Sequence, residues 1–76
     1  MAYFTVEYTF DLGSFGWATE TRKVFSEDTH SIASDLEEMA KHHEFIGFFS
    51  EDREEAKFLP AQRVVVIECT KIPIDD

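Results

Sequence analysis

Apolar and polar residues alternate without interruption between Tyr3 and Phe10, and this pattern constrains the fold more than any other feature of the chain. The residues on one side of the pattern are all apolar or aromatic: Phe4, Val6, Tyr8 and Phe10. A repeat of two residues is typical of a β-strand that buries one face and exposes the other. The segment therefore predicts a half-buried strand that belongs to a sheet covered on one face.

Two glycines follow this strand and predict that the chain reverses direction. Gly13 and Gly16 can both adopt a positive φ, which a tight connection between antiparallel strands requires. A second strand is expected over residues 17–25, because threonine and charged side chains fill its middle. Such side chains protect an edge strand from pairing with other chains, so we expect this strand at an edge of the sheet.

A helix is expected after the hairpin, beginning between residues 29 and 31. Residues 26–29 supply N-cap side chains and negative charge for the positive end of the helix dipole. The apolar stripe that should face the sheet consists of Ile32, Leu36, Met39, Ala40 and His43.

The last thirty residues predict less regular structure. Residues 45–49 form a short apolar run, expected as a third strand or as an extended connection. Ser50 is expected to cap a short helix that ends before Pro60, with a charged hairpin loop as the alternative. The valine-rich segment 62–72 is expected as the final strand, buried on both faces at the centre of the sheet.

These elements predict one α+β domain spanning residues 1–76. Its antiparallel sheet should have three to four strands, with one main helix packed on one face. The other face would then be uncovered. If Tyr3, Trp17 or Phe25 lie on it, that face would be apolar enough for a dimer or partner interface.

Composition predicts a folded, cytoplasmic protein. Hydrophobic residues make up 43% of the chain, which is too many for an intrinsically disordered protein despite its charge. No apolar run has the length of a membrane span, and the first residues lack a signal-peptide pattern. Cys69 is the only cysteine, so we expect a buried thiol on a strand and no disulfide within the chain.

No motif predicts catalysis, a metal or a cofactor. Glu38 and His42 are four residues apart on the expected helix, but no second pair of ligands has metal-binding spacing. The chain has sixteen Asp and Glu residues, so pairs of carboxylates are uninformative, and it has no glycine-rich phosphate loop. The sequence therefore favours a binding protein over an enzyme.

The charge is the second unusual feature, with a formal net charge of −9. Such a field repels nucleic acid and attracts basic protein surfaces. The acids cluster in one part of the sequence, at Asp35, Glu37, Glu38, Glu44, Glu51, Asp52, Glu54 and Glu55. If helix and loop adjoin, these carboxylates form one continuous negative surface resembling a row of phosphates; the alternative is that they only solvate the helix and the loop. Trp17 is a second binding candidate, although packing of its ring onto the core is favoured.

In size, acidity and element order the chain resembles the small phage-encoded inhibitors of bacterial defence, anti-CRISPR proteins among them. The resemblance implies a cytoplasmic inhibitor of a basic, nucleic-acid-binding protein such as a CRISPR effector. Its binding face would be Asp35, Glu37, Glu38, Glu51, Asp52, Glu54 and Glu55, with Trp17 as an anchor. An immunity protein or antitoxin would use the same attraction between an acidic face and a basic toxin. The alternative from a different functional class is a structural or self-assembling homodimeric module.

Overall fold

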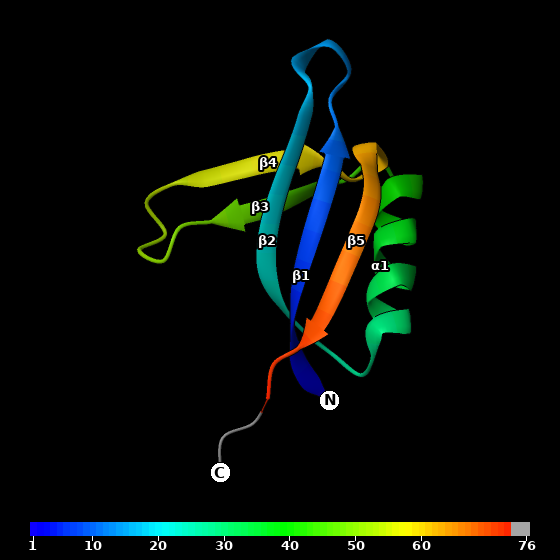
Figure 1. The fold of residues 1–76 in the computed structure, drawn as a ribbon, viewed down its shortest axis with the longest axis vertical. Coiled ribbons are helices and arrows are strands. Elements are labelled where there is room, and N and C mark those ends of the chain that lie inside the picture. The colour runs from blue at the N-terminus through cyan, green and yellow to red at the C-terminus, as the bar shows by residue number, and fades with distance from the viewer. Residues whose placement is uncertain (74–76) are drawn as a thin grey trace.

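The computed structural model describes residues 1–73 and has an α+β fold (Figure 1). A helix follows the first two strands, as expected. The elements in chain order are β1 (Ala2–Asp11), β2 (Trp17–Ser26), α1 (Thr29–Lys41), β3 (Phe45–Phe49), β4 (Ala56–Pro60) and β5 (Val64–Lys71). Short 3-10 turns precede β2 and β5. Within residues 1–73, no helix has the length and apolar character needed to cross a membrane.

Strands β1 and β2 form the predicted hairpin. Their register runs without a break from the pair Ala2 and Ser26 to the pair Asp11 and Trp17. In the connection, Asp11 Oδ1 accepts a hydrogen bond from the Gly13 amide at 3.0 Å. Gly13 and Gly16 have φ values of 65° and 90°, which explains why glycine occupies both positions.

Strand β1, and not the last strand, lies at the centre of the main sheet. The strand order is β2-β1-β5, so β2 is at an edge as predicted, and the prediction of a central β5 is wrong. Thr9 pairs with Val66 and Phe10 with Val64, so Val65 is an extra residue in a bulge. Val65 and Val66 are 51% and 52% exposed. The valine run gave a strand propensity, which an edge strand satisfies as well as a central one.

Helix α1 begins at the predicted place. Asp28 is the N-cap, and its Oδ1 accepts a hydrogen bond from the Ser31 amide at 2.8 Å. Hydrogen bonding from Ser31 lowers the pKa of Asp28. Ile32 is buried against the sheet, but His43 is exposed and does not extend the apolar stripe. The helix ends at Lys41, and His43 has a φ of 56°, outside helical geometry.

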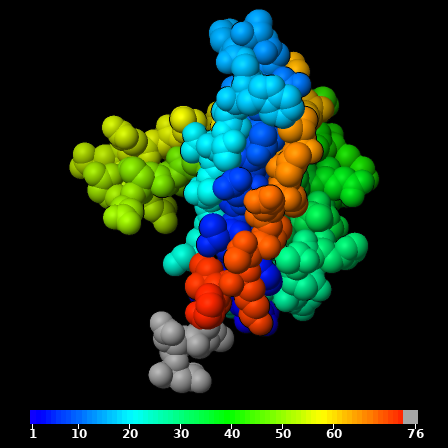
Figure 2. Space-filling model, in the orientation of Figure 1, coloured from blue at the N-terminus to red at the C-terminus, as the bar shows by residue number. Residues whose placement is uncertain are grey.

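Strands β3 and β4 form a second hairpin, here called the arm (residues 45–60), which extends past the β2 edge of the main sheet (Figure 1). Figure 2 shows it standing out from the rest of the molecule. The prediction of a strand at residues 45–49 is confirmed. The predicted short helix is wrong, because residues 50–55 form a turn and Ala56–Pro60 pairs with β3, as in the hairpin-loop alternative.

Aromatic packing attaches the arm to the main sheet. The Phe48 ring meets the Tyr8 ring edge to face, with centroids 5.6 Å apart, and the Phe10 ring at 6.0 Å. Ile46, from the same face of β3, is fully buried. The arm and α1 thus cover the same face of the sheet, the one formed by the alternating apolar residues of β1.

We predict that Phe48→Ala lowers the free energy of unfolding by about 3–5 kcal/mol, because it removes a buried aromatic side chain and leaves a cavity. Phe48 is 7% exposed, whereas Phe15 is 91% exposed. The matched control Phe15→Ala should change stability by no more than about 0.5 kcal/mol. Urea unfolding followed by circular dichroism measures both, and equal losses would contradict the packing described for Phe48.

Candidate partner-binding surfaces

Seven of the eight acidic residues singled out in the sequence occupy two separate places, and the eighth, Glu44, is exposed between α1 and β3. Asp35, Glu37 and Glu38 are exposed on α1, whereas Glu51, Asp52, Glu54 and Glu55 are exposed in the turn at the tip of the arm. Figure 1 shows this turn beyond the β2 edge of the main sheet and α1 at its β5 edge. The condition for one continuous negative surface, that helix and loop adjoin, is therefore not met. The arm extends past β2, while α1 lies behind the sheet on the β5 side.

Hydrogen bonds hold the acidic turn (residues 50–55) in one conformation. Asp52 Oδ1 accepts from the Ser50 hydroxyl at 2.6 Å and from the Glu54 amide at 3.0 Å. The Ser50 hydroxyl oxygen also accepts from the Glu55 amide at 3.1 Å. The hydrogen bonds from Ser50 and Glu54 favour the ionised carboxylate and lower the pKa of Asp52. The turn thus presents its carboxylates from an ordered backbone.

The outer face of the arm is apolar and exposed. Phe45, Phe49 and Phe58 are 60%, 55% and 59% exposed. Phe45 pairs with Pro60, Gly47 with Phe58, and Phe49 with Ala56, so the whole face lacks polar side chains. We call these six residues the apolar arm face. The sequence did not indicate this exposed face, because residues 45–49 are all apolar or glycine and show no alternation that would separate a buried side from an exposed one.

Gly47 lets the aromatic rings of this face lie close to the backbone. A Cβ atom at Gly47 would be 3.0 Å from the Phe49 ring and 3.1 Å from the Phe58 ring. The two rings meet edge to face with centroids 5.9 Å apart. The Arg53 guanidinium lies 5.4 Å from the Phe49 ring centroid. The rings are therefore held in place before any partner binds.

The uncovered face of the main sheet carries aromatic side chains at both ends. Trp17 is 68% exposed, so the favoured interpretation that it packs on the core is wrong. At the other end, the half-exposed rings of Tyr3 and Phe25 contact each other with centroids 4.7 Å apart. They line an apolar pocket of about 390 Å³ together with Met1 and Ile72. Threonine, glutamate and lysine side chains separate the two ends.

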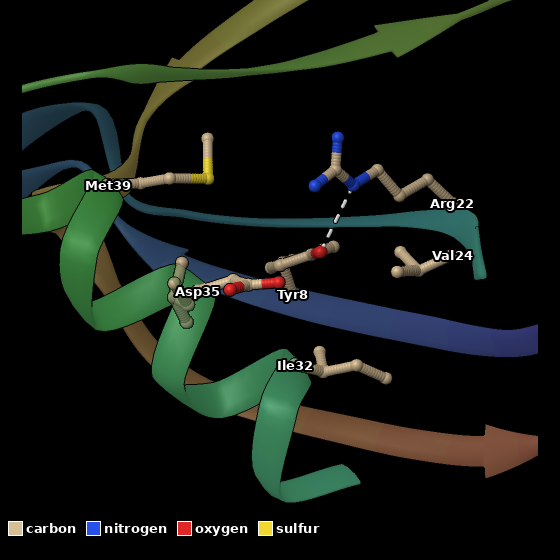
Figure 3. Close-up of a pocket in the computed structure, with 7 residues that line it drawn as sticks. Tyr8, Arg22, Val24, Ile32, Asp35 and Met39 are labelled. Atoms are coloured by element: carbon tan, nitrogen blue, oxygen red, sulfur yellow. Dashed lines mark hydrogen bonds between the residues drawn. The ribbon is translucent and has the colours of Figure 1, made fainter. Parts of the chain in front are cut away.

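A smaller pocket lies between α1 and the sheet (Figure 3). Arg22 Nε donates a hydrogen bond to the Tyr8 hydroxyl at 3.1 Å, and Ile32 and Met39 close the pocket from the helix side. Its volume is about 40 Å³. Small-molecule sites commonly have about 300–1,000 Å³, so this pocket has room for a few water molecules and not for a substrate.

The histidines and the cysteine do not converge on one site. His42 Nε2 lies 3.5 Å from a carboxylate oxygen of Glu38 on the exposed side of α1. Cys69 is partly buried on β5, and burial raises the pKa of its thiol, which favours the unreactive protonated form. Residues 1–73 contain no group of three or more His, Cys, Asp or Glu placed to hold a metal ion.

No family model, curated protein or solved structure matches this chain. Its function is therefore inferred from the three surfaces described above, namely the apolar arm face, the acidic turn and the Tyr3–Phe25 end of the sheet.

We predict that the acidic turn loosens as the pH falls below the ordinary aspartate pKa of 3.8. The pKa of Asp52 is lower in the folded protein, so its contribution is complete above 3.8 and is lost as the pH falls through the folded value. Amide hydrogen exchange at Glu54 and Glu55 should accelerate in that range, relative to the β1 amides. Asp52→Asn keeps an acceptor and should remove this pH dependence. An identical pH profile in the variant would contradict the assignment.

Proposed function

We propose that this protein is a non-enzymatic binding protein whose arm docks on a basic partner protein. The apolar arm face supports the proposal most strongly. A phenylalanine side chain has about 150–250 Å² of surface, so three that are just over half exposed present roughly 250–450 Å². This is comparable to the largest apolar patch on a typical monomer, and such patches are often binding sites.

The acidic turn supports the proposal that the partner's binding surface is basic. It places Glu51, Asp52, Glu54 and Glu55 beside the phenylalanines, offset only by Arg53. A stable interface covers about 800 Å² on each partner, which exceeds the apolar arm face alone. A partner that covers the rings therefore also contacts the acidic turn. Complementarity then requires an apolar pocket with lysine or arginine side chains at its rim.

Nucleic-acid-binding proteins are the partner class that this chemistry favours. Their binding grooves concentrate lysine and arginine, and a protein bound there would exclude nucleic acid. The net charge of −9 favours contact with such a protein and disfavours contact with its nucleic acid. Docking of this kind would inhibit a CRISPR effector or another nucleic-acid-binding enzyme. An immunity protein or antitoxin acting on a basic toxin would use the same arm.

The Tyr3–Phe25 end of the sheet favours a second candidate function, a homodimeric structural module. The two rings and the neighbouring Ile72 form an apolar patch on the uncovered face. A two-fold axis through this patch would bury the rings of one copy against those of the other. This surface lies at the lower end of the main sheet in Figure 1, away from the tip of the arm.

We predict that two double variants distinguish the contribution of the acidic turn to partner binding from that of the acidic residues on α1. Glu54→Lys with Glu55→Lys, in the turn, should weaken partner binding by at least about tenfold. Glu37→Lys with Glu38→Lys, on α1, changes the net charge equally and should leave binding within about threefold, since rim charges far from the contact act weakly. Affinity chromatography from bacterial lysate identifies the partner, and titration of the purified partner gives the affinity.

The apolar contribution is tested with Phe45→Ser and Phe58→Ser against Trp17→Ser as the control of similar exposure. Loss of a basic, nucleic-acid-binding protein with the arm variants, but not with the control, supports the proposal. Added DNA should compete for the same partner. Equal affinity for wild-type protein and the turn and arm variants would refute docking through the arm.

We predict for the homodimer that sedimentation velocity detects a dimer at micromolar concentration and that Tyr3→Ser with Phe25→Ser makes it monomeric. These substitutions remove two half-exposed rings from the patch without touching the buried face of the sheet. Trp17→Ser, at the other end of the uncovered face, should leave the dimer intact. A wild-type protein that sediments as a monomer would eliminate this candidate.

A further inference from the structure

The outer side of β5 is a free edge of the main sheet. The strand order β2-β1-β5 gives β5 a partner on one side only, and the arm lies behind the opposite edge strand, β2 (Figure 1). After the bulge at Val65, residues 66–71 pair with β1 in an unbroken register and contain no proline. We call the outer side of residues 66–71 the β5 edge. A regular edge of this kind can pair with a strand of another chain.

The register shows which backbone groups of β5 point outward. The Ile72 amide donates to the Tyr3 carbonyl oxygen at 2.8 Å, so the backbone groups of Ile72 point toward β1. In an antiparallel pair this orientation alternates along the strand, so the groups of Ile67, Cys69 and Lys71 point away from the sheet. Within residues 1–73, β5 pairs with β1 alone, and no backbone hydrogen bond outside the helices and sheets engages these three residues. Their donors and acceptors are free for a further strand.

A pair of like charges lies beside this edge on the uncovered face of the sheet. Glu7 of β1 is directly opposite Glu68 of β5. Like charges that face each other across two strands are destabilising. The ion pairs within residues 1–73 involve neither of these carboxylates. A cation on a further strand, opposite Glu68, would offset this repulsion.

On the covered face, a strand added at the β5 edge would lie over α1. Figure 1 shows α1 behind the sheet on the β5 side. Asp35 and Met39 line the pocket between the helix and β2. With about 100° between successive residues of a helix, Ala33 and Ala40 lie on the other side of α1, toward β5. Ala33 is exposed and Ala40 is half-buried, so these small side chains leave room for apolar side chains of an added strand.

We propose that the β5 edge binds an extended, basic segment of a partner protein as an additional antiparallel strand. Opposed residues of paired strands point to the same face. Apolar side chains opposite Ile67 and Cys69 would therefore face α1, and a lysine or arginine opposite Glu68 would lie on the uncovered face. Main-chain hydrogen bonds supply affinity in this binding mode, and the alternating side chains supply specificity. The surface is separate from the arm, so this inference goes beyond the proposed function and does not depend on it.

Charge favours a basic segment over a second copy of this chain. Two β5 strands paired around a two-fold axis would bring Glu7 and Glu68 of both copies into one sheet without a cation between them. A basic segment instead places a positive charge beside Glu68. It is also attracted over longer distances by a chain whose net charge is −9.

The test is a titration of the 15N-labelled full chain with a short, end-capped peptide of alternating valine and lysine. Saturable shifts should appear along β5, with a Kd below about 1 mM. Amide hydrogen exchange at Ile67, Cys69 and Lys71 should slow on binding, because these amides gain acceptors. The amides of Glu68 and Thr70 already face β1 and should change less. A peptide that causes no saturable shifts at about 5 mM overturns the proposal.

Two N-methylated peptides test the backbone contact without changing the protein. In the antiparallel alignment, valines opposite Ile67 and Cys69 exchange hydrogen bonds with β5, whereas the lysines turn their backbone groups away from it. N-methylation of the valines should therefore weaken binding by at least about tenfold. N-methylation of the lysines should change binding by less than about threefold. Binding that survives methylation of the valines overturns antiparallel strand addition.

Glu68→Lys tests the charge contact. It should weaken binding of the valine–lysine peptide by at least about tenfold and create binding of a valine–glutamate peptide, which the wild-type protein should not bind. The variant also removes the like-charged pair with Glu7, so the fold should be retained, as circular dichroism checks. Glu44→Lys makes the same change in net charge at an exposed position between α1 and β3 and should change binding by less than about threefold.

Equal losses with the Glu68 and Glu44 variants, or unchanged binding by Glu68→Lys, overturn the proposal. The peptide titration reports on β5 alone, and partner capture by the arm is measured with variants of the arm and its turn. The two proposals therefore fail separately.

Discussion

The contact of Phe48 with Tyr8 and Phe10 is the interaction on which the arrangement of this protein depends. Strand β1 has an apolar face that runs along its whole length, and the thirteen-residue helix α1 covers only part of it. The remaining part is covered by Ile46 and Phe48 from the arm. The chain therefore completes its core with a hairpin that crosses behind β2, and this crossing sets the direction in which the arm extends (Figure 1).

The surfaces with functional potential follow from that crossing. A two-stranded hairpin that uses one face to complete a core leaves its other face without cover, so Phe45, Phe49 and Phe58 stay exposed. The same crossing leaves a cleft between the arm and the free edge of β2, where Thr21 lies opposite Gly47 and Phe49. Apolar surface and negative charge are thus close together on one projecting element. A small chain buries only a modest share of its surface on folding. The side chains that stay exposed can give the protein specificity for a partner.

Local sequence patterns predicted which helices and strands form better than they predicted which of these elements lie next to each other. Alternation and glycine conformations predicted the β1–β2 hairpin, and capping predicted the start of α1 at Asp28. A short apolar run predicted a strand or an extended connection at residues 45–49, and it forms a strand. All of these signals act over a few residues. The central position expected for β5 was wrong, because valine content reports strand propensity and not the place of a strand in a sheet. The helix expected after Ser50 was wrong for a related reason. The polar side chains that follow Ser50 can stabilise a turn as well as a helix N-terminus. The pairing of β4 with β3 favoured the turn.

The sequence by itself determined that the chain forms an α+β fold and that it carries a large negative charge, because composition and periodicity are properties of the chain. Only the tertiary structure decided which charged and aromatic side chains lie together. It separated the acids of α1 from those of the turn, exposed Trp17, and brought Phe48 of the arm against Tyr8 of β1 from forty residues away. The physical reason is that non-local contacts are set by how apolar faces share a core, and one-dimensional patterns contain no information about which faces meet.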